Sequence, residues 1–67
     1  MAIARVTEII SSSKKSLDDA VKTGIERACK TLDGVTGAWI KDQKVDIKNG
    51  KVTEYRVNLK VTFILKD

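Results

Sequence analysis

The stretch "VTEYRVNLKVTFILKD" (residues 52–67) decides the fold, because polar and apolar side chains alternate along most of it. The apolar and aromatic set is Tyr55, Val57, Leu59, Val61, Phe63 and Leu65, and the polar set is Glu54, Arg56, Asn58, Lys60 and Thr62. Successive side chains of a strand point to opposite faces, so a period of two predicts a long strand with one buried face.

The residues just before this strand predict a hairpin. "KNGK" (48–51) contains Asn-Gly, which is typical of a tight two-residue turn between antiparallel strands. "VTGAWIKDQKVDI" (35–47) then supplies the second strand of the pair.

This second strand changes its apolar phase partway along. Ala38 and Ile40 share one phase, whereas Val45 and Ile47 share the other. A bulge or sharp bend would bring both pairs to the same side of the sheet. We therefore predict a break in regular pairing across Asp42–Lys44, which keeps Ile40 and Val45 buried.

A polar turn followed by one helix is predicted for "SSSKKSLDDAVKTGIERACKTLDG" (11–34). Ser16 is a natural N-cap, because its side-chain oxygen can accept from the backbone N–H of Asp19. Gly34 is placed to end the helix in a left-handed conformation. We interpret Cys29 as a small core residue. An apolar stripe recurs at spacings of three and four: Leu17, Val21, Ile25, Ala28, Cys29 and Leu32.

The first segment, "AIARVTEII" (2–10), is rich in β-branched residues and predicts a strand with apolar residues on both faces, both of them covered. The order is then β-α-β-β. The last strand could exceed about 40 Å in length. The helix is only about 24 Å long. We expect an α+β fold in which a three-stranded antiparallel curved sheet wraps around one helix, as a single domain over residues 1–67.

Composition excludes several function classes. The chain has 67 residues, one Cys, no His and a net charge of +4. An internal disulfide is impossible, and histidine-based metal sites and Ser-His or Cys-His catalysis are excluded. We expect no enzyme activity and no metal site. A chain this small needs another source of stability, and self-association is the one left. Nucleic acid and membranes are not expected partners, and the cytoplasm is the expected compartment.

Five stretches together resemble the dodecins: "VTEII" (6–10), "SLDDAVKTGIERACKTLDGV" (16–35), "IKDQKV" (40–45), "NGKVTEYRV" (49–57) and "LKVTF" (59–63). The resemblance covers nearly the whole chain. It implies a hollow homododecamer of cubic symmetry that stores or sequesters a flavin (FMN or riboflavin) without turning it over. It also implies paired flavins sandwiched between tryptophans at subunit interfaces.

Two positions depart from the flavin-binding pattern of the family. Gly37 stands where those members carry the stacking Trp, and the Trp of this chain, Trp39, comes two residues later. Residues i and i+2 face the same side of a strand, so the displacement is roughly 6.7 Å along it. Arg56 stands where those members carry a Gln that bonds the flavin's pyrimidine edge. Arg only donates hydrogen bonds, so it cannot accept from the imide N–H of a flavin.

The candidate ligand-binding residues are Gly37, Ala38, Trp39, Gln43, Lys44 and Arg56. We predict that Trp39 faces away from the helix, with Arg56 on the same face. Lys44 lies near a position where some dodecins carry a basic residue toward the flavin tail.

Other interpretations of these residues remain open. Trp39 packs at an interface without a ligand, Arg56 pairs with Glu54 or with a subunit neighbour or stacks on Trp39, and Asp42 and Gln43 serve the bend and the interface. The alternative function is a dodecin-fold assembly that has lost flavin or binds another small planar or anionic ligand. A nucleic-acid-binding oligomer is a weaker third hypothesis.

Overall fold

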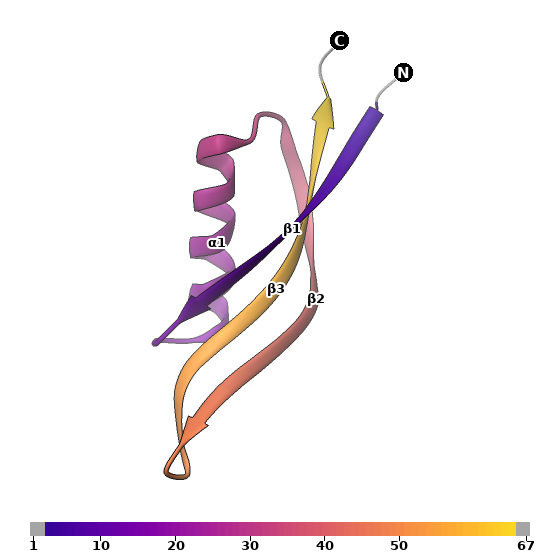
Figure 1. Cartoon of the computed structure of the whole chain (residues 1–67). Coiled ribbons are helices and arrows are strands. Elements are labelled where there is room, and N and C mark those ends of the chain that lie inside the picture. Colours follow the sequence, from indigo (N-terminus) through magenta and orange to yellow (C-terminus); the bar gives the residue numbers. More distant parts are fainter. Residues whose placement is uncertain (1–2, 66–67) are drawn as a thin grey trace.

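The computed structural model describes residues 3–65 (Figure 1). Its four elements are β1 (Ile3–Ser13), α1 (Leu17–Thr31), β2 (Val35–Lys48) and β3 (Lys51–Leu65). The three strands form one antiparallel sheet in the order β1-β3-β2, so the alternating strand lies at its centre. The predicted α+β fold, with one helix against a curved three-stranded sheet, is confirmed.

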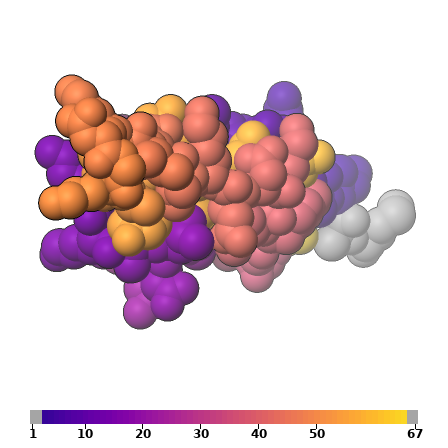
Figure 2. All heavy atoms as spheres, turned by 90° about the horizontal axis from the view of Figure 1, so that it is seen from below, coloured from indigo at the N-terminus to yellow at the C-terminus, as the bar shows by residue number. Residues whose placement is uncertain are grey.

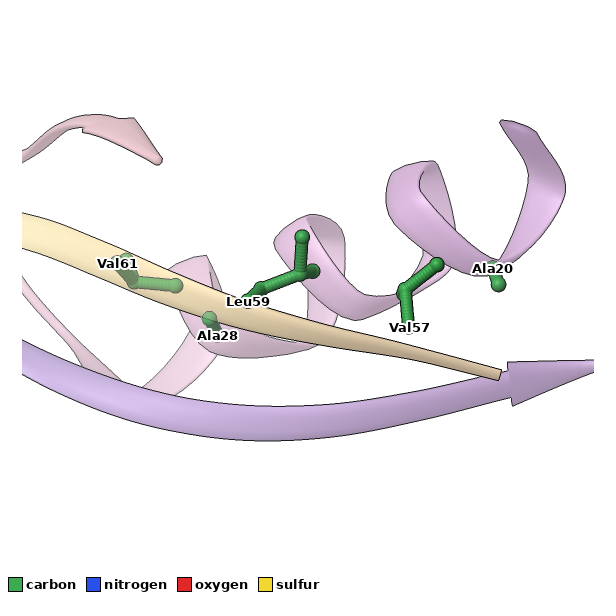
Figure 3. Packing of buried hydrophobic residues seen from close by; sticks show 5 residues of the cluster. All are labelled: Ala20, Ala28, Val57, Leu59 and Val61. Atoms are coloured by element: carbon green, nitrogen blue, oxygen red, sulfur yellow. The ribbon is translucent and has the colours of Figure 1, made fainter. Parts of the chain in front are cut away.

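The core lies between the central strand and the helix (Figure 3). Val57, Leu59 and Val61 of β3 are buried, as the alternation predicts, and they pack with Ala20 and Ala28 of α1. Only these five hydrophobic residues among residues 3–65 are buried. Within one chain, this is a small core.

Small side chains form the line of closest contact between α1 and the sheet. Ala20, Gly24 and Ala28 are the buried residues of the helix, at a spacing of four. A Cβ added at Gly24 would lie 2.8 Å from the Cβ of Ser11 on β1, so only glycine permits this approach. The predicted apolar stripe omits two of these residues. Four of its larger members flank the contact line and are partly buried: Leu17, Val21, Ile25 and Leu32.

Cys29 is exposed in the single chain, so its interpretation as a core residue is wrong there. The physical reason is the position of α1, which packs mainly on β1 and β3 and contacts β2 least. Cys29 is on the side of the helix that faces β2, where the chain supplies no cover.

The helix begins as predicted and ends differently. The backbone N–H of Asp19 donates to Ser16 Oγ at 3.0 Å, which confirms Ser16 as the N-cap. Leu32 is the C-cap in an extended conformation. Gly34 is left-handed (φ +73°) but lies two residues beyond that cap, so it turns the connection into β2 and does not terminate the helix. Its carbonyl accepts from the backbone N–H of Ile64 at 3.0 Å.

The hairpin between β2 and β3 follows the Asn-Gly prediction. Asn49 and Gly50 both have positive φ, at 54° and 75°, as a type I′ turn requires. The register places Lys48 opposite Lys51 at the start of the turn. The hairpin projects beyond the end of α1 (Figure 1).

The predicted break in β2 exists, but it falls slightly earlier. The register shifts between Ile40 and Asp42, which leaves Lys41 as the extra residue of a bulge. Two further shifts lie between Val35 and Gly37 and between Asp46 and Ile47. The four residues between Ile40 and Val45 are all polar, so the apolar pattern could not show which of them is the bulge.

The bulge does bring Ile40 and Val45 to the same side of the sheet, since they pair with Leu59 and Tyr55. They are nevertheless 47% and 36% exposed, so the expected burial is not met within one chain. The expected cover on both faces of β1 is not met either, because Ile10 is 69% exposed.

The molecule is elongated and has much surface for its mass. It measures 52 × 19 × 13 Å, with a radius of gyration of 13.8 Å. A typical domain of this length has a radius of gyration of about 11 Å. The accessible surface is 5124 Å². That is about 900 Å² more than the roughly 4,200 Å² expected of a folded monomer of 7.4 kDa.

Candidate functional site

The candidate site lies on the sheet face that α1 does not cover, which we call the open face. Residues paired across strands share a face, so the register defines its members. They are Ala4, Val6, Glu8, Ile10 and Ser12 on β1, Glu54, Arg56, Asn58, Lys60, Thr62 and Ile64 on β3, and Gly37, Trp39, Asp42, Lys44 and Asp46 on β2.

Trp39 points to the open face, as predicted. It pairs with Lys60, and the ammonium nitrogen of Lys60 lies 5.7 Å from the centroid of the indole ring. This is a cation–π distance, so Lys60 and not Arg56 is the cationic neighbour of the ring. The residue is 49% exposed. An indole half open to water on an uncovered sheet face is available to a partner or to a planar ligand.

Arg56 is held by an acidic residue of the neighbouring strand. Its Nη2 donates to Asp46 Oδ2 at 3.0 Å, and Lys44 Nζ lies 3.9 Å from Asp46 Oδ1. Arg56 therefore pairs with an acidic residue, but with Asp46 and not with the expected Glu54. The register puts Asp46 diagonally across from Arg56, within reach of its long side chain.

Trp39 and Arg56 share a face but do not touch within one chain. Arg56 is four residues along β3 from Lys60, the partner of Trp39. At the rise of a strand this is about 13 Å. A planar ligand on the indole would meet Arg56 only by extending toward the hairpin, or across a boundary between chains.

A small cavity of about 240 Å³ lies on the open face toward the hairpin from Trp39. Its lining combines two cations, an anion, an amide and one apolar residue: Lys44, Arg56, Asp42, Asn58 and Ile10. Such a lining suits a polar part of a ligand better than an aromatic ring.

A network of polar side chains from all three strands borders this cavity. Asn58 Nδ2 donates to Glu8 Oε2 at 3.0 Å, and Lys41 Nζ lies 3.5 Å from the same oxygen. Asn58 holds the pKa of Glu8 below its usual range, and Lys41 and Lys60 add to the effect. Asn58 Oδ1 is buried and has no hydrogen-bond partner within residues 3–65. The partners of Glu8, Asn58 and Asp46 depend on the register between strands, so no pattern in the sequence marks these three as site residues.

The register divides the six predicted ligand residues between the two faces. Gly37, Trp39, Lys44 and Arg56 lie on the open face. Ala38 and Gln43 pair with Val61 and Val57, whose side chains are buried against the helix, so they lie on the other face. A Cβ at Gly37 would meet nothing within 4 Å, so there is room beside the tryptophan.

A second hollow, the α1–β2 groove, lies on the helix side of the sheet. It has a volume of about 480 Å³ and is mostly apolar. Its lining includes Val21, Ile25 and Cys29 of α1, Val35 and Ile40 of β2, and Leu59 of β3. The predicted ligand residues Gly37, Ala38 and Trp39 also border it. The groove exists because α1 packs mainly over β1 and β3 and leaves this side of β2 partly uncovered.

The described part of the chain offers neither a metal cluster nor a membrane span. Within residues 3–65, no three acidic or cysteine side chains come together as metal ligands. Over the same residues, no helix has the length and apolar character needed to cross a bilayer.

One helix wrapped by a three-stranded antiparallel sheet, with a tryptophan on the uncovered face, defines a class of small β-α-β-β proteins. This chain belongs to one family of that class, the dodecins: the Dodecin family model matches residues 3–66. No protein of curated function matches the sequence significantly.

Solved structures agree with this assignment. Dodecin from Streptomyces coelicolor is 30% identical, with a TM-score of 0.93 over 98% of this chain and 94% of that one. An R→A variant of the Thermus thermophilus dodecin is 28% identical, with a TM-score of 0.93 over all of both chains. A calcium dodecin from Mycobacterium tuberculosis, described as calcium chelating, is 28% identical, with a TM-score of 0.82 over 96% of this chain and 91% of that one.

Proposed function

We propose that this chain is a self-assembling dodecin that binds FMN or riboflavin on the open face and stores or sequesters it. We propose that the whole chain acts as one domain, that twelve copies form the particle, and that it works in the cytoplasm, which the single cysteine supports. The observation that carries the proposal is the half-exposed Trp39 on the open face of a family member.

The large accessible surface and the small core of the single chain support self-assembly. A surface excess of about 900 Å² over a typical monomer is close to the roughly 800 Å² that each partner buries in a standard interface. The core has only five buried hydrophobic residues among residues 3–65. Association would cover the exposed apolar residues of both sheet faces.

Two features support flavin binding at Trp39: the direction in which the indole points and the open space beside Gly37. The indole points to the open face, and a Cβ built at Gly37 would meet nothing within 4 Å, so the space beside Gly37 is open. The Lys60 ammonium already lies over the ring, so a flavin must displace this lysine or use the other ring face. Either choice lowers the expected affinity.

Polar groups near the hairpin would receive the flavin's polar parts. Lys44 lines the small cavity and is a cation suited to a phosphate. Arg56 can donate to ring carbonyls but is held by Asp46 and cannot accept from the imide N–H. We therefore expect FMN to bind better than riboflavin, and both to bind weakly.

A second candidate function is an assembly of the same fold with a different ligand or none. The two departures at Gly37 and Arg56 favour it, because they change both a stacking and a hydrogen-bonding position. The calcium dodecin among the structural neighbours supports it too, since a protein of the same fold is described by another ligand.

Flavin fluorescence separates the two candidates. Ligand-free protein is titrated into FMN and into riboflavin, alongside Trp39→Phe, which keeps a stacking ring, and Trp39→Leu, which does not. We expect the parent chain in large excess to quench the flavin fluorescence, Trp39→Phe to quench it less, and Trp39→Leu not to quench it. Unchanged fluorescence at a large excess of parent protein would refute flavin binding, and full quenching by Trp39→Leu would refute the site.

A further inference from the structure

The side-chain oxygen of Asn58 is a buried acceptor with no donor in its own chain. Among residues 3–65, Asn58 Oδ1 is the only buried side-chain nitrogen or oxygen without a hydrogen-bond partner. Buried polar atoms are nearly always paired in folded proteins, because an unpaired one costs free energy. Asn58 lies on the central strand of the open face, between Ile10 of β1 and Asp42 of β2, and it borders the small cavity of about 240 Å³. The wall of this cavity therefore contains an acceptor that the chain does not use.

The orientation of the Asn58 amide is fixed by its neighbour on β1. Nδ2 donates to Glu8 Oε2 at 3.0 Å, and Lys41 Nζ lies 3.5 Å from the same carboxylate oxygen. An amide turned the other way would bring its oxygen against the carboxylate, which only accepts. Oδ1 is therefore the atom left for a ligand. An amide oxygen accepts and never donates, so the ligand group that it fits is an N–H or an O–H.

Arg56 supplies donors on the same wall of the cavity. It is two residues from Asn58 along β3, so both side chains lie on the open face, and both line the cavity. Nη2 of Arg56 is used by Asp46 Oδ2, but a guanidinium has five N–H groups, and the others can donate elsewhere. An acceptor beside donors is complementary to an N–H beside a carbonyl. The imide edge of a flavin, in which two carbonyls flank one N–H, has this pattern.

Asn58 is also closer to the tryptophan than Arg56 is. It is two residues along β3 from Lys60, the partner of Trp39, which is roughly 6.7 Å at the rise of a strand. A fused three-ring system stacked on the indole can extend over this distance. In Figure 2 the hairpin, in orange, and β2, in salmon and pink, form one continuous surface of the molecule. A ring that extends from Trp39 toward the hairpin therefore stays on the sheet.

We propose that Asn58 determines the specificity of the site for an imide: its Oδ1 accepts from the ring N–H of the flavin, while Arg56 donates to a neighbouring ring carbonyl. The inference rests on the proposed flavin binding. It assigns to Asn58 the one contact that Arg56 cannot make, because a guanidinium accepts no hydrogen bond. Stacking on Trp39 is common to all planar rings, whereas the bond to Asn58 is made only by a ring that carries the N–H.

Binding in this way requires a small movement at the cavity. Asn58 Oδ1 is closed to solvent in the single chain, so a ring reaches it only when a neighbouring side chain moves. Lys44 lines the same cavity, and its side chain is 67% exposed and long enough to turn outward. Its contact with Asp46 is 3.9 Å long and partly exposed, and exposed ion pairs of this kind contribute little to stability. The movement is therefore compatible with the fold.

A pair of flavins tests the contact from the ligand side. Riboflavin and N3-methylriboflavin have the same three rings and the same tail, and the second lacks the imide N–H. Each is titrated with the parent chain, and the dissociation constants are obtained from flavin fluorescence. We expect riboflavin to bind about tenfold more tightly, since its analogue leaves the acceptor unpaired. This comparison needs no variant of the protein.

Two variants then assign the preference to a residue. Asn58→Ala removes the acceptor and leaves room for the extra methyl group, so the preference for riboflavin should fall to about onefold. The matched control is Asp42→Ala, because Asp42 is another acceptor that lines the same cavity and pairs directly with Asn58 across the strands. We expect Asp42→Ala to keep the preference, even where it weakens the binding of both flavins.

The results separate this inference from the proposed function. Equal binding of the two flavins by the parent chain would overturn the role of Asn58 and leave flavin binding intact. A preference that survives in Asn58→Ala would overturn it as well, and its loss in Asp42→Ala alone would assign the acceptor to Asp42. If neither flavin is quenched by a large excess of the parent chain, the proposed function is refuted, and this inference with it.

Discussion

The substitution Gly24→Ala tests how closely α1 is seated on the sheet. In an isolated helix, alanine is more stable than glycine by about 1 kcal/mol. In this structure the new Cβ would lie 2.8 Å from the Cβ of Ser11 and 3.3 Å from Cδ1 of Leu59. The Cβ of Ser11 is fixed to the backbone of β1, so the helix or the strand has to move. Overpacking of this kind costs typically about 1–3 kcal/mol.

The clash should outweigh the helix propensity, which leaves Gly24→Ala less stable than the parent by about 1 kcal/mol. The assay is urea unfolding at one fixed protein concentration, followed by the fluorescence of Trp39, the only tryptophan. Fixed concentration matters because association shifts apparent stability. Gly37→Ala is the matched control, since its Cβ meets nothing within 4 Å. A Gly24→Ala chain that is more stable than the parent would show that the helix is not held this closely.

Further predictions concern the open face. Arg56→Gln should strengthen flavin binding, because Gln both donates and accepts; weaker binding would show that Arg56 helps the ligand. The triple variant Gly37→Trp, Trp39→Glu, Arg56→Gln should bind still better in the same titration, and an assembled variant that binds no better would contradict the alignment of this site with the dodecin pocket. Lys44→Ala should weaken FMN more than riboflavin, whereas equal losses would place the phosphate elsewhere. Because the pKa of Glu8 is lowered in the folded chain, its stabilisation is present above its unfolded pKa and lost as pH falls through the folded pKa. Glu8→Gln should therefore destabilise at neutral pH and not in acid, and an equal effect at both would contradict this.

Much of the fold followed from local patterns. The alternation in β3, the Ser16 cap and the Asn49–Gly50 turn each have a local physical cause, and each is confirmed. The bulge was inferred from a change of apolar phase, but its position at Lys41 depends on cross-strand pairing. The close contact at Gly24 was missed because a glycine carries no apolar signal in a helix pattern.

The direction in which Trp39 points could be predicted from the sequence, but the side chains that contact Trp39 and Arg56 could not. The phase argument alone places Trp39 on the open face. Which cation lies over its ring, and which acid holds Arg56, depends on the register between β2 and β3. The exposure of Cys29 could not be predicted for a similar reason, because the amphipathic pattern of the helix cannot show over which strands it packs.

The most direct test of the account is light scattering of the ligand-loaded protein with flavin absorbance recorded across the same peak. Twelve chains of 7.4 kDa make a particle of about 89 kDa. We predict one peak near this mass, with flavin absorbance that follows the protein and is lost in Trp39→Leu. A peak near the mass of one chain, or an assembly of the expected mass from which flavin separates completely at saturating concentration, would contradict it.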